Sequence, residues 1–300
     1  MFDGRSLSEE TIEALLAAGL DADEVRRTVG AALDEDLSGG VDVTSVATIP
    51  ADHRSRATFV ARHDGVVAGL ALARSAIELV CGAAAAFEVV VPDASRVRAG
   101  EALAVAGAPT RGLLTAERTA LNYLCHLSGV ATLTRRWADA VDGTTAVVRD
   151  TRKTTPGLRR LEKYAVRCGG GANHRMGLSD MALVKDNHVA AAGGVAEAFA
   201  RVRALADVPV EIEVDTLDDL RLAIEAGADE VLIDNFTIDE MRAAVALRDR
   251  TRPEVRLEAS GGLTVVSARA VAETGVDFIA VGQLTHSAPV LDIGLDLVAG

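Results

Sequence analysis

The second half of the chain alternates short apolar runs with longer amphipathic segments. Each apolar run has the length of a buried strand, and most segments between them repeat apolar residues at helical spacing. The strand-like runs are Thr145–Arg149, Ala182–Lys185, Val210–Val214, Glu230–Ile233, Val255–Ala259 and Phe278–Val281. The helical segments are Gly157–Cys168, Val195–Ala206, Leu217–Ala226, Ile238–Arg248 and Val265–Glu273. Strands and helices that alternate through short loops form right-handed crossovers, so we predict an α/β fold whose parallel sheet curves toward a barrel.

The barrel that this pattern predicts is incomplete. Six strands are clear, and one short extra strand is expected near Asn173–Arg175. A closed TIM barrel has eight parallel strands. We therefore predict a TIM-like barrel of about six or seven strands, which occupies residues 129–285.

The first half of the chain mixes helices and strands without regular alternation. Apolar residues on one face predict helices at Ser8–Ala18 and Asp21–Leu37. The alternation in Ser55–Ala68 predicts two strands that turn at Asp64-Gly65. Together with the runs that follow, these elements predict an amino-terminal α+β open-faced sandwich domain over residues 1–128.

A long helical pattern, Leu113–Trp137, ends this first half. We expect the helix to break or bend near Ser128-Gly129, because glycine is a poor residue for a helix interior. Arg118 would lie on its outer face, where an arginine is ordinarily solvated or paired with an acid.

Composition limits the class of protein. The 300 residues are 49% hydrophobic but only 3% aromatic, so the core is built from aliphatic side chains. Three scattered cysteines, Cys81, Cys125 and Cys168, show no metal-binding spacing and suit a reducing compartment. The chain shows neither a signal-peptide pattern nor an apolar run of membrane-spanning length, so we expect a soluble, cytoplasmic protein. The net charge of −13 argues against nucleic acid or an anionic membrane as partner.

Positive charge is concentrated in one segment, residues 149–188. This segment holds nine Lys or Arg against four acids, whereas the rest of the chain sums to −18. A local excess of cations in an acidic protein attracts anions. The anion should be small, because nucleic acid needs a basic face rather than one basic segment.

Most of the predicted strands end at polar residues for which an apolar core has no use. These are Arg149 through Lys153, Lys185-Asp186, Glu213 with Asp215, Asp234-Asn235, Glu258 with Ser260, and Gly282. The carboxyl ends of parallel barrel strands lie on one face, where such folds place their chemistry. Asp186 or Asp215 alone is equally well explained as a helix cap, but Arg, Lys and His are poor N-caps. We therefore expect the set to form one pocket.

The pocket is predicted to have two subsites of opposite charge. The cationic subsite comprises Arg152, Lys153, His174, Arg175 and Lys185. Guanidinium groups bind carboxylates through paired hydrogen bonds, so this subsite suits a substrate with two carboxylates. Glu213 and Asp234 could accept hydrogen bonds from ribose hydroxyls or help to hold Mg²⁺. Ser260-Gly261-Gly262 and Gly282-Gln283-Leu284 follow the last two strands and offer backbone N–H groups to a phosphate.

Four motifs resemble the central signature of the quinolinate phosphoribosyltransferases, also called carboxylating nicotinate-nucleotide pyrophosphorylases. They are TRKTTPGLR, Gly169-Gly170-Gly171, Asn173-His174-Arg175 and Lys185-Asp186-Asn187-His188. The resemblance extends from EDL…DVTS near the amino terminus to LTHSAPVLDIGLDL near the carboxyl terminus. It implies a Mg²⁺-dependent pentosyltransferase of de novo NAD biosynthesis. The reaction would transfer phosphoribosyl from phosphoribosyl pyrophosphate to quinolinate and yield nicotinate mononucleotide, pyrophosphate and CO₂.

The resemblance also implies roles for individual residues. Catalysis would depend on Lys153, Lys185, Glu213 and Asp234. Quinolinate would be bound by Arg118, Thr151, Arg152, Lys153, His174, Arg175 and Lys185. Phosphoribosyl pyrophosphate would be bound by Glu213, Asp234, Ser260, Gly261, Gly262, Gly282, Gln283 and Leu284. Glu213 and Asp234 would hold Mg²⁺, directly or through water. Arg118 would reach the neighbouring site of a homodimer, and residues 286–300 would rejoin the amino-terminal domain.

Three other functions are compatible with parts of the pattern. A paralogue of the same fold, such as the related protein associated with molybdenum transport, would use another acceptor in place of quinolinate. A barrel lyase or isomerase for a sugar phosphate would explain the phosphate loops but not the dicarboxylate-like cation cluster. A non-catalytic anion sensor would bind without turnover.

Overall fold

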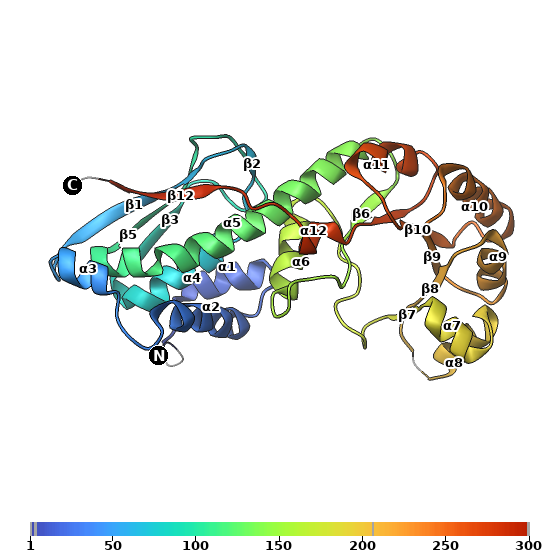
Figure 1. The fold of residues 1–300 in the computed structure, drawn as a ribbon, viewed down its shortest axis with the longest axis horizontal. Helices are drawn as coiled ribbons and strands as arrows, with labels where there is room; N and C mark the ends of the chain where they lie inside the picture. Colours follow the sequence, from blue (N-terminus) through green and yellow to red (C-terminus); the bar gives the residue numbers. More distant parts are fainter. Residues whose placement is uncertain (1, 3–4, 206, 299–300) are drawn as a thin grey trace. The chain divides into compact units, whose positions relative to one another are not determined.

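A computed structural model describes residues 2, 5–205 and 207–298 of the chain (Figure 1). The chain folds into two compact units. Unit 1 comprises Met1–Leu133, Arg160–Gly170 and Ser287–Gly300, and unit 2 comprises Thr134–Arg159 and Gly171–His286. Within the described residues, no helix is long and apolar enough to cross a membrane.

Unit 2 contains a six-stranded parallel sheet with the strand order β6-β11-β10-β9-β8-β7. The strands are β6 (Val147–Arg149), β7 (Ala182–Val184), β8 (Val210–Val214), β9 (Glu230–Asp234), β10 (Arg256–Ser260) and β11 (Phe278–Ala280). All six predicted strands are confirmed. The expected extra strand near Asn173–Arg175 is reduced to a single bridge between Arg149 and Ala172, on the free edge of β6. The α/β fold with an incomplete barrel is therefore confirmed.

Helices follow the strands of unit 2, and all but the last of them lie along one side of the sheet (Figure 1). They are α7 (Asp186–Ala192), α8 (Val195–Leu205), α9 (Leu217–Glu225), α10 (Ile238–Thr251), α11 (Val265–Ala272) and α12 (Gln283–His286). Thr216, Thr237 and Thr264 cap α9, α10 and α11 by accepting backbone N–H bonds, which satisfies donors that the helix leaves free. Each strand consequently ends close to a loop and a helix start, which brings polar groups to one edge of the sheet.

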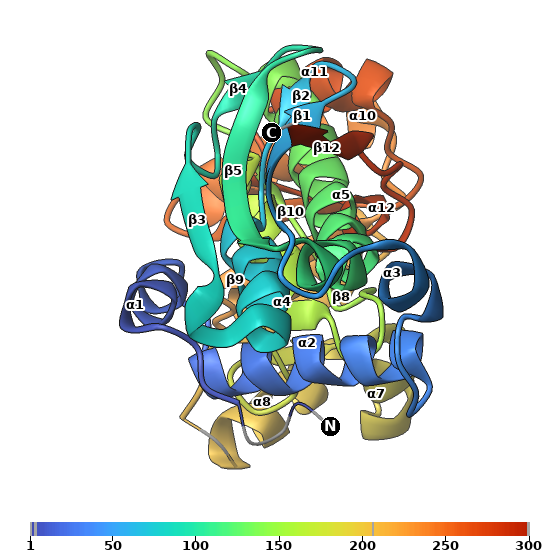
Figure 2. The same cartoon turned by 90° about the vertical axis from the view of Figure 1, so that its left-hand side faces the viewer.

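Unit 1 is built on a four-stranded antiparallel sheet with the order β12-β1-β5-β3 (Figure 2). These strands are β1 (Arg54–Ala61), β3 (Ala86–Val89), β5 (Ala102–Pro109) and β12 (Ile293–Val298). The helices of unit 1 are α1 (Glu9–Ala17), α2 (Ala22–Leu37), α3 (Val43–Thr48), α4 (Leu70–Cys81), most of α5 (Thr110–Ala140) and most of α6 (Arg159–Cys168). The predicted α+β class of this region is confirmed, and Ser8 and Asp21 cap α1 and α2.

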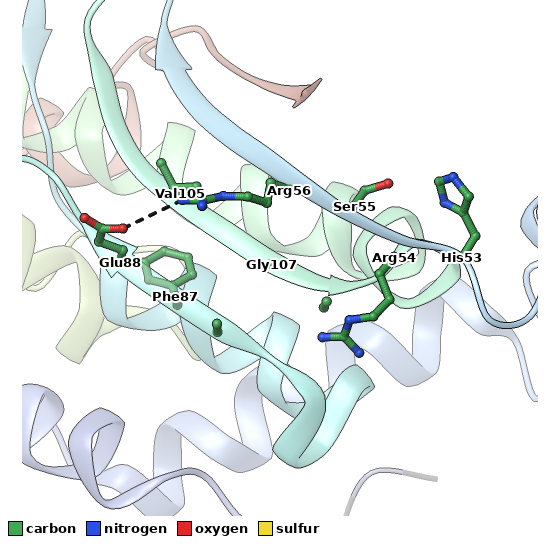
Figure 3. Close-up of a pocket in the computed structure, with 10 residues that line it drawn as sticks. His53, Arg54, Ser55, Arg56, Phe87, Glu88, Val105 and Gly107 are labelled. Atoms are coloured by element: carbon green, nitrogen blue, oxygen red, sulfur yellow. Dashed lines mark ion pairs between the residues drawn. The ribbon is translucent and has the colours of Figure 1, made fainter. Parts of the chain in front are cut away.

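The two faces of the unit 1 sheet differ. Ala57, Phe59 and Ala61 of β1 are fully buried on one face. The opposite face forms a groove of about 870 Å³ (Figure 3). Arg56 and Glu88 face each other across this groove with 3.9 Å between Nη2 and Oε2, and both side chains are mostly exposed. We call this feature the unit 1 groove.

Two predictions for unit 1 are wrong. The strand at β2 (Gly65–Val66) does not form a hairpin with β1 but pairs with β4 (Arg96–Val97), because β5 and β12 occupy both edges of β1. Helix α5 is continuous through Gly129, so the expected break is wrong, while a bend there stays a prediction. Glycine is needed there for another reason, since a Cβ would lie 2.8 Å from Cα of Val290.

Candidate functional site

The carboxyl ends of the unit 2 strands surround a cavity of about 430 Å³, which we call the unit 2 cavity. Ten of the residues predicted to form one pocket line it, namely Thr151, Arg152, Lys153, His174, Arg175, Lys185, Glu213, Asp234, Glu258 and Ser260. Leu183, Leu232 and Ala280 complete the lining. A cavity of this size with several charged groups matches a site for small, charged molecules.

The cavity lining includes three cations that stand apart from the ion pair of Lys185 with Glu213. Within the described residues, Arg152, Lys153 and Arg175 form no ion pair with a carboxylate. Nε of Arg152 is buried and has no hydrogen-bond partner within the described part of the chain. Burial, and next the repulsion from Arg152, lower the pKa of Arg175. Glu211 and Asp180 act on the pKa of Arg175 in the opposite direction, but two guanidinium groups that repel each other still favour an anionic ligand.

The backbone around Lys153 is fixed from two sides. Its N–H donates to Oγ1 of Thr151 at 3.0 Å, and its carbonyl accepts from Oγ1 of Thr285 at 2.8 Å. Gly282 packs against its side chain, because a Cβ there would lie 2.9 Å from Cδ of Lys153. The exposed ammonium group is therefore presented on a short, rigid turn.

Lys185 lies at the start of α7 and forms an ion pair with Glu213. Its backbone N–H donates to Nδ1 of His188 at 3.0 Å. The ammonium group is about half exposed, whereas the Glu213 carboxylate is mostly buried. The pair joins the cationic side of the cavity to its acidic side.

Asp234 and its neighbour Asn235 form the other part of the acidic side. Asn235 has a left-handed backbone conformation, with φ of 57°, and its Nδ2 donates to Oδ2 of Asp234 at 2.6 Å. Its N–H donates to the carbonyl of Ser260 at 3.0 Å. Gly261 has φ of 93°, and a Cβ there would lie 2.7 Å from N of Asn235. Glycine is therefore required at this strand end by both conformation and space.

The remaining predicted residues lie outside the cavity lining. Gly261, Gly262, Gly282 and Gln283 are close in sequence to lining residues but do not line it. Leu284 is fully buried, and its N–H is bonded to the carbonyl of Val281, so neither group is available to a ligand. Arg118 is exposed on α5 in unit 1, and Asp215 is exposed beyond β8.

A buried charged cluster extends from the cavity wall into the core of the sheet. Its members are Arg149, His174, Glu211, Glu230 and Glu258. Nη1 of Arg149 contacts Glu230 at 2.5 Å and Glu258 at 2.8 Å. Nε2 of His174 lies 2.7 Å from Oε2 of Glu211 and 3.5 Å from Oε1 of Glu258. We call this group the core cluster.

The core cluster contains more acids than cations. Burial, and next the repulsion from Glu230, raise the pKa of Glu211 to about 8. Burial, and next the repulsion from Glu211, raise the pKa of Glu258 to about 8. Arg149, together with Arg256 at Glu230, does not offset the burial of three carboxyl groups, and the raised pKa values of Glu211 and Glu258 favour their protonated forms near neutral pH.

The core cluster also has the composition of a metal site. Ligand atoms of His174, Glu211, Glu230 and Glu258 lie within 4.8 Å of one another. Arg149, however, already supplies a positive charge to two of these carboxylates. On the cavity surface, the carboxylates outside the core cluster are those of Glu213 and Asp234.

The hydrogen bonds of His174 bear on the charge expected of it within the cationic group. His174 lines the cavity, but its Nδ1 accepts the backbone N–H of Arg175 at 2.7 Å. A ring nitrogen that accepts a hydrogen bond carries no proton, so the imidazole is neutral. The positive charge on this wall comes from the arginines and lysines.

Glu211 and Glu230 were missed from the sequence because they lie within strand-like runs. In β8, Glu211 and Glu213 are two residues apart and therefore point to the same face of the strand. Two acids on one face of an otherwise apolar strand were the available signal. Such acids are almost never fully buried unless they are paired.

Models of two protein domains match the chain. The quinolinate phosphoribosyl transferase C-terminal domain matches residues 130–296, and the N-terminal domain of the same enzyme matches residues 42–128. Nicotinate-nucleotide pyrophosphorylase (carboxylating) of Mycobacterium leprae (strain TN) is 50% identical over 278 residues, which cover 92% of this chain and 98% of that protein. The probable enzyme of the same name from Bacillus subtilis (strain 168) is 42% identical over 265 residues, with coverages of 88% and 90%.

Solved structures give the same result. The nicotinate-nucleotide pyrophosphorylase from Francisella tularensis matches with a TM-score of 0.87 at 38% identity, covering 92% of this chain and 96% of that one. NadC from Streptococcus pyogenes matches with a TM-score of 0.86 at 35% identity, covering 99% and 100%. The similarity therefore includes both units.

Proposed function

The chain belongs to the quinolinate phosphoribosyltransferase family, and we propose how the side chains of the unit 2 cavity divide the work of that family's reaction. The chain catalyses the quinolinate phosphoribosyltransferase reaction of de novo NAD biosynthesis. Phosphoribosyl is transferred from phosphoribosyl pyrophosphate to the ring nitrogen of quinolinate, and nicotinate mononucleotide, pyrophosphate and CO₂ are released.

Quinolinate binds to the unpaired cations of the cavity in this proposal. Arg152, Lys153 and Arg175 receive its two carboxylates, and Thr151 keeps the turn before Lys153 in place. The buried, unpartnered Nε of Arg152 is the observation that supports this assignment most directly. A buried donor without a partner costs free energy that an anionic substrate would recover.

Phosphoribosyl pyrophosphate binds on the acidic side, where Ser260 and Asp234 mark the ends of β10 and β9. Loss of pyrophosphate develops positive charge on the ribose, as in glycoside cleavage. The carboxylates of Glu213 and Asp234 stabilise that charge, because they are already oriented when the substrate arrives. Lys185 holds Glu213 until substrate binds and then contributes its charge to the anionic groups.

The metal assignment is limited to the same two carboxylates. Mg²⁺ takes oxygen ligands and retains several waters. Glu213 and Asp234 fit these needs, since Asp234 has one oxygen bonded to Asn235 and the other not. When bound, Mg²⁺ would offset negative charge on the departing pyrophosphate.

Decarboxylation follows from the new bond. Alkylation of the ring nitrogen turns the pyridine ring into an electron sink, so the carboxylate next to it leaves as CO₂ and its electron pair enters the ring. No described side chain is placed as a nucleophile with its own base, and the cavity therefore acts by positioning and electrostatics.

Labelled substrate tests the assignment. Quinolinate labelled in the carboxylate next to the ring nitrogen should release CO₂ only when both phosphoribosyl pyrophosphate and Mg²⁺ are present. Release without the sugar substrate would indicate direct decarboxylation and contradict the proposed transfer, whereas transfer to nicotinate in place of quinolinate would favour a paralogue with another acceptor.

We also propose that Arg118 completes the neighbouring site of a homodimer. It is an exposed cation on α5, and the resemblance to the family implies an arginine at this position that reaches the partner's site. Mixing inactive Arg118→Ala and Lys153→Ala proteins should then restore about a quarter of wild-type activity, because half of the dimers reassort with one intact site. Activity that stays at the level of the single variants would refute sharing.

We propose that residues 1–128 and 286–300 form one domain and residues 129–285 the other. The antiparallel pairing of β12 with β1 supports the return of the carboxyl terminus. We expect a protease to cleave near residues 128 and 286, and we expect the fragments of each domain to remain folded. A cytoplasmic location of the protein also stays a prediction.

A further inference from the structure

His174 is held at three points within unit 2. Its backbone N–H donates to Oδ1 of Asp150 at 2.9 Å, and Nε2 lies 2.7 Å from Oε2 of Glu211. Nδ1 accepts the backbone N–H of Arg175 at 2.7 Å. The residue is only 8% exposed, so its ring has little freedom to turn.

These contacts fix which ring nitrogen carries the proton. A backbone N–H can only donate, so Nδ1 of His174 must be bare to accept from Arg175. The ring proton then lies on Nε2 and is donated to Oε2 of Glu211, which can accept it in either protonation state. An imidazolium ion would have a proton on both nitrogens and would lose the contact with Arg175.

We propose that Glu211 is a positioning residue for the quinolinate subsite. It holds His174 as the Nε2–H tautomer, and the bare Nδ1 in turn fixes the backbone of Arg175. The guanidinium of Arg175 is held separately, by donation from Nη1 to the carbonyl of Met181 at 3.1 Å. This inference rests on the proposed assignment of Arg175 to quinolinate.

The position of Glu211 supports a functional reason for its presence. It is fully buried in β8, and its Oε1 has no hydrogen-bond partner within the described residues. An apolar residue there would avoid the cost of burying a carboxyl group. The contact that distinguishes Glu211 from the other buried acids is its short hydrogen bond with His174.

Other charged groups also face His174, and they limit what a pH change would mean. They come from several elements around the ring and are Arg149, Asp150, Arg175, Glu211, Glu230 and Glu258. The tautomer is nevertheless set by geometry, because Nδ1 has a donor in front of it whatever the charge of these groups.

Steady-state kinetics on three variants test the proposal. Glu211→Leu removes the acceptor for Nε2–H and should raise KM for quinolinate about tenfold, with KM for phosphoribosyl pyrophosphate within about twofold of wild type. Glu211→Gln keeps an acceptor oxygen, so KM for each substrate should stay within about threefold of the wild-type value. Glu230→Gln is the matched control, because Glu230 is equally buried but contacts Arg149 and Arg256, so neither KM should change.

Two substitutions of the histidine separate its two nitrogens. Asn places its amide near Nδ1, whereas Gln places its amide near Nε2. His174→Asn can still accept from Arg175 and should retain KM for quinolinate within about threefold, whereas His174→Gln should raise it about tenfold. If His174 acted as a cation toward the substrate, both substitutions would cost the same.

Nitrogen-15 NMR of the ligand-free protein reads the tautomer directly, with His174→Asn used to assign the signal. One bare and one protonated ring nitrogen that persist from about pH 6 to pH 8 are expected. Two protonated nitrogens in that range, equal losses in Glu211→Gln and Glu211→Leu, or a raised KM in Glu230→Gln would overturn the proposal. The NMR measurement needs no substrate, so it tests the tautomer whether or not quinolinate is turned over. A protein that does not turn over quinolinate would overturn the proposed function instead.

Discussion

The unit 1 groove is about twice as large as the unit 2 cavity, yet the two differ most in what supports their charged groups. Arg56 and Glu88 of the groove are 69% and 74% exposed and meet at 3.9 Å. In the cavity, His174 is backed by Glu211 and Glu258, both fully buried. Exposed pairs are screened by water, whereas buried ones act at lower dielectric. Support of charge in the interior, rather than volume, distinguishes the cavity that we propose as the active site from the unit 1 groove.

The largest expected effect tests whether the unpaired cations matter as much as this contrast implies. Lys153→Ala should lower kcat about 1,000-fold, roughly 4 kcal/mol of barrier, because charge on the substrates would lose a positioned ammonium group. Thermal unfolding should be unchanged, since Lys153 is exposed. Arg242→Ala removes an exposed cation from α10 as the control and should leave kcat within about twofold. Near-normal turnover by Lys153→Ala would remove the cavity from consideration as the active site.

The next largest expected effect is the pH dependence of stability that arises from Glu258 in the core cluster. The pKa of Glu258 is raised to about 8 from its ordinary value of 4.5, so between these values the folded protein retains a proton that the unfolded chain has lost. Its stabilising contribution is therefore full below about pH 4.5 and is lost as pH rises through about 8. Glu258→Gln lacks this titration. As the pH rises from 5 to 9, its free energy of unfolding should therefore increase by about 2–4 kcal/mol relative to that of wild type.

Denaturant unfolding of wild type and Glu258→Gln at a series of pH values measures this difference. Glu88→Gln in the unit 1 groove is the control, because its exposed side chain should show no such trend. A constant difference between wild type and Glu258→Gln across the range would mean that the buried carboxyl is ionised throughout.

A smaller effect is expected at the glycines that follow β10. Gly261→Ala should raise KM for phosphoribosyl pyrophosphate about tenfold, since its Cβ would displace Asn235 and with it Asp234. Gly262 also has positive φ but no atom within 4 Å of a Cβ, so Gly262→Ala reports conformational strain alone. Equal effects from both substitutions would argue against a role for the contact with Asn235.

The smallest effect belongs to the unit 1 groove. Arg56→Ala breaks the pair with Glu88 and should change the free energy of unfolding by less than about 0.5 kcal/mol, because both partners are exposed. Denaturant unfolding at low and high salt measures it. A loss above 2 kcal/mol would show that Arg56 stabilises the groove more than an exposed side chain normally does.

The regular part of the fold was readable from sequence because β8 to β11 are short apolar runs that end at polar residues. The pairing of β2 was not, since it depends on which strands already occupy the edges of β1. Helix α3 was missed because its sequence, VTSVAT, is rich in β-branched residues that favour strands. Asp42 caps this helix and stabilises a segment whose intrinsic preference is otherwise weak.

The same distinction applies to the site. Lys153, Lys185 and Glu213 could be named because they follow strands, where parallel sheets gather polar groups. The charge state of His174 could not, because it depends on a hydrogen bond from the next residue in a particular backbone conformation. Glu230 and Glu211 escaped notice because an acid inside an apolar run looks like a flanking residue until the strand register is known.

The parallel sheet of unit 2 stops short of a ring, with β6 and β7 as its two free margins. Bare strand margins can recruit strands of other molecules and so promote aggregation. Here β7 spans only Ala182–Val184, and Ala172 pairs with β6 at Arg149. Because these margins are short, they offer little backbone for pairing with other molecules, which limits aggregation. Shortening the connection between them or lengthening β7 would make the sheet more regular but the protein less soluble.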